Sequence, residues 1–261
     1  MRVRKPFRVT AAAAALALGL TACGGGGSSE DDPEASGPTG EPGGSYTAEL
    51  TEPSFLAPAS NCYESECSAV LDLVNDPLVS TDFESGDLKF DGLAESIEPN
   101  DDQTVWTVTL KDGLKFQNGE PVDADSFLRA WNYSQDAKNA QATAGFMARI
   151  EGAGEGPEMS GLKKVNDTTF EVALNGPFSQ FGQQMSYAPA FAPMAQECFD
   201  DIKACNEKPI GTGRYEMDGA WKHDQSIALT KWADYQGEQP ANADNIEFAM
   251  FASPTAAFRD F

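Results

Sequence analysis

The sequence is poor in basic residues and has a single histidine. It carries 18 lysines and arginines against 41 aspartates and glutamates, which gives a formal net charge of −23. A surface this acidic repels nucleic acid and anionic lipid, so we expect neither as a partner. The lone histidine, His223, also argues against zinc and against a serine–histidine hydrolase, since no nucleophile motif lies near it. We interpret His223 as a solvated turn residue.

The chain also lacks an apolar run long enough to cross a bilayer as a helix. The apolar stretch Ala11–Leu20 follows a basic start, as in a secretory signal, and residues 1–22 are interpreted as one. The next segment, Leu20-Thr21-Ala22-Cys23, matches a bacterial lipobox, so we expect lipid on Cys23. An ordinary cleavage site with an incidental cysteine is the alternative. Residues 1–22 contain no adjacent arginine pair, which favours general secretion over the twin-arginine route.

Residues 23–45 contain mainly Gly, Ser, Pro and acidic residues. Such a segment cannot bury a core, and we expect it to be a disordered tether. The folded part would then lie outside the cytoplasm and would touch the cell membrane only through the lipid on Cys23. With 41% hydrophobic and 10% aromatic residues, the rest of the chain has enough apolar side chains for a substantial core.

Cysteine is scarce, with five residues in all. Apart from Cys23, two lie close together at Cys62 and Cys67, and two at Cys198 and Cys205. Disulfides are the default outside the cytoplasm, and four cysteines allow three connectivities. We choose the two local pairs, whose short loops gain little from chain entropy and serve mainly to fix loop shape. No metal site and no cofactor are expected.

The most informative stretch is residues 104–135. Trp106, Val108 and Leu110 alternate with threonines, which predicts a strand with one buried face. A turn follows, then a return strand over 114–116, and Asp123 is placed to cap a helix. The spacing therefore predicts a hairpin, a tight turn and a helix, and spacing alone is also consistent with a generic α+β hairpin.

This stretch resembles the signature of extracytoplasmic solute-binding proteins of ABC importers, in the oligopeptide, dipeptide and nickel group known as family five. Pro209-Ile-Gly-Thr-Gly-Arg-Tyr215 resembles the family's Pro-x-Gly-Thr-Gly-Pro-Tyr segment, with Arg214 in place of proline. At the helix cap, Asp123 and Ser126 stand where the family has threonine and an acid. From this departure we expect the reciprocal capping box to be lost.

The resemblance implies an α/β, type II periplasmic-binding-protein fold with two lobes that close on a solute. Members run to roughly twice this length, so we expect a truncated chain with lobe I and an inserted small αβ domain. Lobe I maps to residues 46–74 and 176–261, and the inserted domain to residues 75–175. Residues 187–194 contain two prolines and are predicted to be an extended connection.

The resemblance also implies a binding protein, not an enzyme, that works as a monomer with the permease of an ABC transporter. An oligopeptide held through its backbone is the expected ligand. The expected contacts come from a loop between two cysteines, an aromatic residue further on, and the Gly-Thr-Gly segment: Tyr63, Glu64, Tyr187, Thr212 and Gly213.

Three alternatives stay open. The solute could be nickel or another small non-peptide ligand, although a single histidine argues against direct nickel ligation. The chain could be an inactive fragment, because half of a clamp leaves its cleft open. A hydrolase with a pair of carboxylates is not excluded by composition, although no spacing among the 41 acidic residues singles one pair out.

Overall fold

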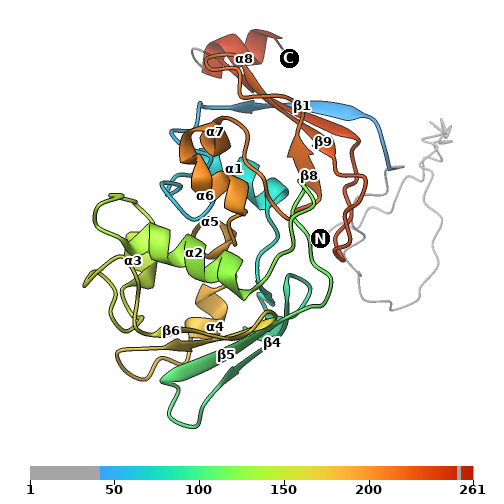
Figure 1. The fold of residues 1–261 in the computed structure, drawn as a ribbon. Coiled ribbons are helices and arrows are strands. Elements are labelled where there is room, and N and C mark those ends of the chain that lie inside the picture. The colour runs from blue at the N-terminus through green and yellow to red at the C-terminus, as the bar shows by residue number, and fades with distance from the viewer. Residues whose placement is uncertain (1–41, 252–253, 261) are drawn as a thin grey trace, which may run out of the picture. The chain divides into compact units, whose positions relative to one another are not determined.

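The computed structural model describes residues 42–251 and 254–260, and residues 41–261 form one compact unit (Figure 1). The expected signal segment, the lipobox with Cys23 and almost all of the tether lie outside the described residues. The strands are β1 Ser45–Leu50, β2 Ser80–Thr81, β3 Leu88–Lys89, β4 Ala94–Pro99, β5 Val105–Leu110, β6 Leu162–Asn166, β7 Thr169–Ala173, β8 Tyr215–Met217, β9 Ser226–Lys231 and β10 Asn245–Met250. The helices are α1 Ser65–Val74, α2 Ala124–Gln135, α3 Ala144–Met147, α4 Phe181–Gln184, α5 Ala188–Phe191, α6 Gln196–Asp200, α7 Ile202–Glu207 and α8 Pro254–Asp260.

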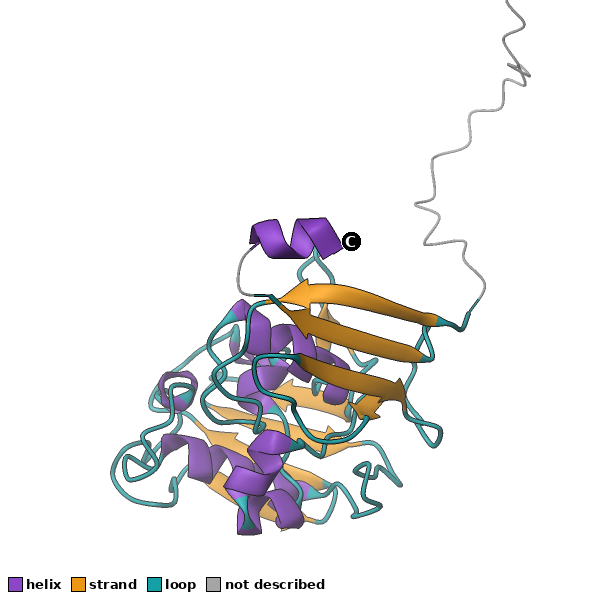
Figure 2. Ribbon diagram, turned by 90° about the horizontal axis from the view of Figure 1, so that it is seen from above, coloured by secondary structure: helices purple, strands orange, loops and turns teal. Residues whose placement is uncertain are grey.

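The first sheet pairs a strand from the start of the described chain, β1, with a strand near its end, β10. Its strand order is β1-β10-β9-β8, and β1 runs parallel to β10 while the other pairs are antiparallel. Figure 2 shows these strands side by side, with helices packed beneath them. Alternate residues of β9 and β10 point inward, and Ile227, Leu229 and Ile246 are at most 2% exposed. This alternation is the period of a strand with one buried face.

The second sheet has the order β4-β5-β7-β6 and is antiparallel throughout. Trp106, Val108 and Leu110 of β5 are buried, as their alternation with threonine predicts. The hairpin expected between β5 and residues 114–116 does not form, because β5 pairs with β4 and β7 on its two sides. Residues 114–122 instead fold on themselves through one isolated bridge between Lys115 and Pro121.

Helices lie between the two sheets in Figure 1, and each sheet has its own hydrophobic cluster. In α1, Cys67, Val70, Leu71 and Val74 follow the helical spacing and pack toward β8–β10. Beside the second sheet, Trp131 of α2 packs edge-on against Phe127, Phe170 and Phe191. Its indole Nε1 donates a hydrogen bond of 3.2 Å to the carbonyl oxygen of Phe191, so the ring is both buried and satisfied.

The hydrophobic cluster beside the second sheet also contains residues that follow that sheet in the chain. It includes Phe181, Phe191, Cys198 and Cys205, which all follow residue 175. The expected boundary between an inserted domain and lobe I therefore passes through shared hydrophobic packing. The assignment of residues 75–175 to a separate domain stays a prediction.

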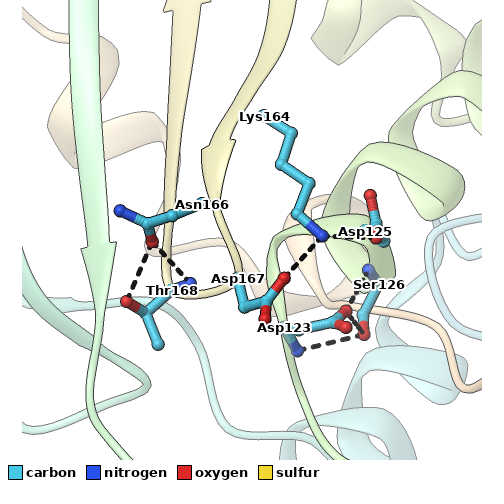
Figure 3. A network of polar contacts seen from close by, with 7 residues as sticks. All are labelled: Asp123, Asp125, Ser126, Lys164, Asn166, Asp167 and Thr168. Carbon is cyan, nitrogen blue, oxygen red and sulfur yellow. Dashed lines mark hydrogen bonds and ion pairs between the residues drawn. The ribbon is translucent and has the colours of Figure 1, made fainter.

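The start of α2 corrects the expectation of a lost capping box. The Asp123 carboxylate accepts a hydrogen bond of 2.9 Å from the backbone N–H of Ser126, and the Ser126 hydroxyl accepts one of 3.2 Å from the backbone N–H of Asp123. A serine hydroxyl reaches back as an acid does in the usual box. Figure 3 shows this cap beside Lys164, which forms ion pairs of 2.7 Å with both Asp125 and Asp167.

The proline-containing segment 187–194 is also not fully extended. It forms the short helix α5, with Pro189 in its first turn. Proline is tolerated there because a first-turn N–H has no partner within the helix. This turn brings Phe191 against Trp131 and leaves Tyr187 at the helix start.

Candidate functional site

The loop before α1 is fixed by a disulfide. Cys62 and Cys67 are joined at an S–S distance of 2.03 Å, as expected, and both are fully buried. Between them, Tyr63 is 68% exposed. Glu64 stands at the cap position of α1 but makes no capping hydrogen bond, because its carboxylate accepts the backbone N–H of Ser54. The disulfide therefore positions an exposed ring and a carboxylate at the start of α1.

Tyr187 lies beside the first turn of α1. Its hydroxyl is 3.4 Å from the Ser68 hydroxyl, and its ring stacks on Phe146 with centroids 5.1 Å apart. Phe146 did not stand out in the sequence, although a single aromatic residue in a polar, alanine-rich stretch was a usable signal. The two rings form a half-buried aromatic surface beside the first half of α1.

Thr212 and Gly213 lie at the other end of α1 and contact it directly. The Thr212 hydroxyl accepts a hydrogen bond of 3.0 Å from the N–H of Asp76, and the N–H of Gly213 donates one of 2.7 Å to the Val74 carbonyl. A Cβ at Gly213 would lie 2.6 Å from the Leu73 carbonyl oxygen. The close approach expected of this glycine is therefore made to α1, and its contact with a ligand stays a prediction.

A cavity of about 270 Å³ adjoins the flank of α1 and includes Tyr187 in its wall. Its other lining residues come from the end of α1, the β2–β3 region, the connection from α4 into α5, the loop before β8 and the loop after β9: Asp72, Asn75, Asp76, Pro77, Ser80, Asp91, Gly92, Ser186, Ala188, Arg214, Tyr235 and Gln239. The five predicted residues are thus not one cluster. Tyr63 and Glu64 lie at the start of α1, Tyr187 lies beside the cavity, and Thr212 and Gly213 lie at the end of α1.

Burial is the main cause of the raised pKa of three groups in this cavity. Burial raises the pKa of Asp76 to about 6, although a hydrogen bond from Tyr235 opposes the shift. Burial also raises the pKa of Asp72, and the positive charge of Arg214 opposes that shift. The pKa of Tyr235 is raised by burial first and then by the charge of Asp76. Asp76 is 8% exposed and therefore poorly solvated, whereas Asp72 stays open to solvent.

A larger cavity of about 540 Å³ is lined by α6, α7, β8 and the loops at residues 117–118 and 208–210. Its wall includes the second expected disulfide, Cys198–Cys205, with an S–S distance of 1.99 Å. None of the five predicted ligand residues lines it. We therefore build the candidate site on the cavity beside α1, which is smaller.

His223 is more than a solvated turn residue. Although its side chain is 52% exposed, Nδ1 is 2.8 Å from Glu52 and Nε2 is 2.9 Å from Glu207, and the ring lies on Trp221. These carboxylates raise the pKa of His223. Within the described residues, no group of three or more His, Cys, Asp or Glu side chains is arranged to hold a metal ion. Over the same residues, no helix has the length and apolar character of a membrane span.

Residues 91–261 match the model of the bacterial extracellular solute-binding proteins, family 5. The chain belongs to this family. It is 29% identical over 181 residues to the oligopeptide-binding protein OppA of Bacillus subtilis, which covers 66% of this chain and 33% of OppA. It is also 29% identical over 185 residues to the nickel-binding periplasmic protein of Escherichia coli, which covers 70% of this chain and 33% of that relative.

The fold of this family 5 chain is similar to that of OppA from Listeria monocytogenes bound to peptide. The TM-score is 0.72 at 22% identity, and the match covers 85% of this chain and 45% of that structure. This similarity confirms the expected fold class. The family 5 chain spans about a third of the length of the curated relatives it matches, and these relatives are solute-binding proteins, not enzymes.

Proposed function

We propose that this family 5 chain is the lipid-anchored binding component of an ABC importer and that it binds oligopeptides. One observation carries the choice of ligand face. The disulfide holds the loop with the exposed Tyr63 at the start of α1, and the Ser68 hydroxyl in the first turn of α1 lies 3.6 Å from the Cys62 sulfur and 3.4 Å from the hydroxyl of the half-buried Tyr187. Two aromatic rings near one rigid helix start suit an extended peptide, because such rings tolerate many different side chains.

Calorimetric titration of the full chain with a mixed peptide pool tests this proposal. Heat that saturates with peptide supports it, and the matched variant Tyr63→Ala should weaken binding. Phe83→Ala serves as the control, because Phe83 is another exposed aromatic residue but lies in the β2–β3 turn. The absence of heat with any peptide contradicts oligopeptide binding by this chain.

Nickel is the second candidate, because the chain is as similar to a nickel-binding relative as to OppA. The described residues offer no metal cluster, so nickel would need ligands brought by the solute or lying elsewhere. Titration with Ni²⁺ alone separates the two candidates. Heat with Ni²⁺ and none with peptide would favour nickel.

The anchor and the location form a separate part of the proposal. The segment Leu20-Thr21-Ala22-Cys23 supports lipid on Cys23, and the permease of an ABC transporter is the proposed partner of the anchored monomer. Expression of Cys23→Ser beside the unchanged chain tests the anchor. We expect the unchanged chain in the membrane fraction and the variant released from it, whereas equal membrane association of both contradicts a lipid on Cys23.

A further inference from the structure

The chain contains two asparagines that are each followed by glycine, Asn118 before Gly119 and Asn175 before Gly176. Asparagine is chemically labile, and most of all before glycine, because no Cβ shields the backbone nitrogen that can attack the asparagine side chain. The attack requires a glycine nitrogen that is free and an asparagine side chain that can turn toward it. The structure makes the two sites different in both respects.

At the first site both reacting groups are held in place. The Gly119 N–H donates a hydrogen bond of 2.8 Å to the Phe116 carbonyl. The Asn118 amide nitrogen donates bonds of 2.7 Å to Glu120 and 3.0 Å to Glu197, and its Oδ1 accepts one of 3.1 Å from the N–H of Glu120. Reaction at this site would first have to break these bonds, so the fold protects Asn118.

At the second site the attacking nitrogen is free. Within the described part of the chain, the Gly176 N–H has no hydrogen-bond acceptor and the Asn175 Oδ1 has no donor. The Asn175 amide nitrogen donates two long bonds, of 3.3 Å to the Ala148 carbonyl and 3.4 Å to the Ile150 carbonyl. Asn175 is exposed, and a Cβ at Gly176 would meet nothing within 4 Å, so water reaches both groups.

We propose that Asn175 is a site of self-modification, at which the Gly176 nitrogen converts the asparagine to aspartate and isoaspartate. The new bond joins the Gly176 nitrogen to the Asn175 Cγ, and the bond from Cγ to Nδ2 breaks. Nδ2 leaves as ammonia with the proton that the glycine nitrogen loses. Water then opens the cyclic imide at either of its carbonyls, which restores the glycine N–H and gives aspartate or isoaspartate.

The modification removes two contacts that hold residues 148–150 against the end of β7. A carboxylate cannot donate to the Ala148 and Ile150 carbonyls and brings negative charge toward them. Isoaspartate also lengthens the backbone by a methylene group. Residues 148–150 directly follow α3, whose Phe146 ring stacks on Tyr187. We therefore expect the modification to loosen the aromatic surface beside α1.

Peptide mapping by mass spectrometry tests the inference on the full chain, aged at mildly alkaline pH. In the folded chain, Asn175 should deamidate about tenfold or more faster than Asn118, because reaction at Asn118 must first break hydrogen bonds. The same chain aged in urea is the control, since unfolding removes this protection and should bring the two rates together. Equal rates in the folded chain would overturn the inference. An Asn175 that stays intact there after the unfolded chain has reacted would also overturn it.

The variant Gly176→Ala tests the attacking nitrogen. Its methyl group has free space, so the fold should be kept, and it should slow the reaction at Asn175 to the rate of Asn118 or below. Gly156→Ala is the matched control, because a Cβ at Gly156 also meets nothing within 4 Å, and it should leave both rates unchanged. A rate at Asn175 that Gly176→Ala does not lower would contradict attack by this nitrogen.

Hydrogen exchange tests the consequence for the aromatic surface. Amides of residues 144–150 should exchange faster in the aged chain than in an Asn175→Gln variant aged beside it, which keeps an amide but forms the cyclic imide much less readily. Equal exchange would contradict the loosening of this segment. These readouts are independent of ligand binding, so a failed peptide titration would overturn the proposed function and leave this inference intact.

Discussion

The two longest helices begin in different ways. α2 starts at Asp123, whose carboxylate and partner Ser126 close the helix end with reciprocal hydrogen bonds. α1 starts at Glu64, which makes no cap and instead contacts Ser54, beside a disulfide and the exposed Tyr63. One helix start is satisfied by its own residues, whereas the other is held by the loop that we propose for the ligand. Both helices bury a face in the core, so they differ in how their starts are held and not in whether they pack.

The largest effect on stability is expected from a substitution in the core around α2. Trp131→Ala removes the ring that contacts Phe127, Phe170 and Phe191, together with its hydrogen bond to a backbone carbonyl. A cavity of this kind should lower the free energy of unfolding by about 3–5 kcal/mol. Chemical denaturation monitored by circular dichroism measures it. The control Phe83→Ala should change stability little, because that ring is fully exposed.

The second-largest effect on stability is expected where the Gly-Thr-Gly segment packs against the end of α1. Gly211→Ala would place a Cβ 2.0 Å from the Val74 carbonyl oxygen, so backbone must move. We expect a loss of about 1–3 kcal/mol in the free energy of unfolding. Gly145→Ala is the matched control, since nothing lies within 4 Å of its Cβ and alanine favours the helix α3. Equal stability of the two variants would contradict the proposed docking of the Gly-Thr-Gly segment on α1.

These two predictions also show what the sequence could reveal. The alternation in β5 and the cap at Asp123 depend on neighbours in the chain, and local patterns predicted both. The parallel pairing of β1 with β10 and the contact of Gly211 with Val74 join distant segments. Periodicity carries no information about such pairs, which is why the partners of β5 were also predicted wrongly.

In the candidate site, too, local sequence predicted some features, whereas features formed by distant segments were not predicted. The disulfide of Cys62 and Cys67 and the exposure of the loop between them follow from local spacing. The cavity could not be predicted in this way, because residues that line it, such as Asp72 and Arg214, are far apart in the chain and no sequence motif links them. Gly213 was expected to approach a ligand and approaches α1, since a glycine indicates close packing but not against what.

The third prediction compares the two helix starts directly. Asp123→Ala removes the cap of α2 and should lower the free energy of unfolding by about 1 kcal/mol. Glu64→Ala removes no cap of α1 and should change stability less, while weakening peptide binding if its carboxylate serves the ligand. Thermal unfolding and calorimetric titration of both variants measure the two effects. A larger loss of stability for Glu64→Ala than for Asp123→Ala would contradict this comparison of the two helix starts.

The smallest expected effect is a dependence on pH near the site. His223 lies between Glu52 and Glu207, and Glu52 is two residues from Ser54, which contacts Glu64. The carboxylates raise the pKa of His223 above its ordinary value of 6.5, so the folded chain binds this proton more tightly than the unfolded chain. The stabilisation is therefore complete below about pH 6.5 and is lost as the pH rises through the raised pKa.

His223→Gln isolates this contribution. The difference in the free energy of unfolding between the unchanged chain and this variant should be largest near pH 6 and should shrink toward about pH 8.5. It should also shrink in high salt, because the imidazole is exposed and exposed ion pairs are weak and screened. Denaturation curves at several pH values measure it. A difference that grows with rising pH would mean that the neutral ring, not the protonated one, holds Glu52 and Glu207 together, and the link from His223 to the loop before α1 would then not be electrostatic.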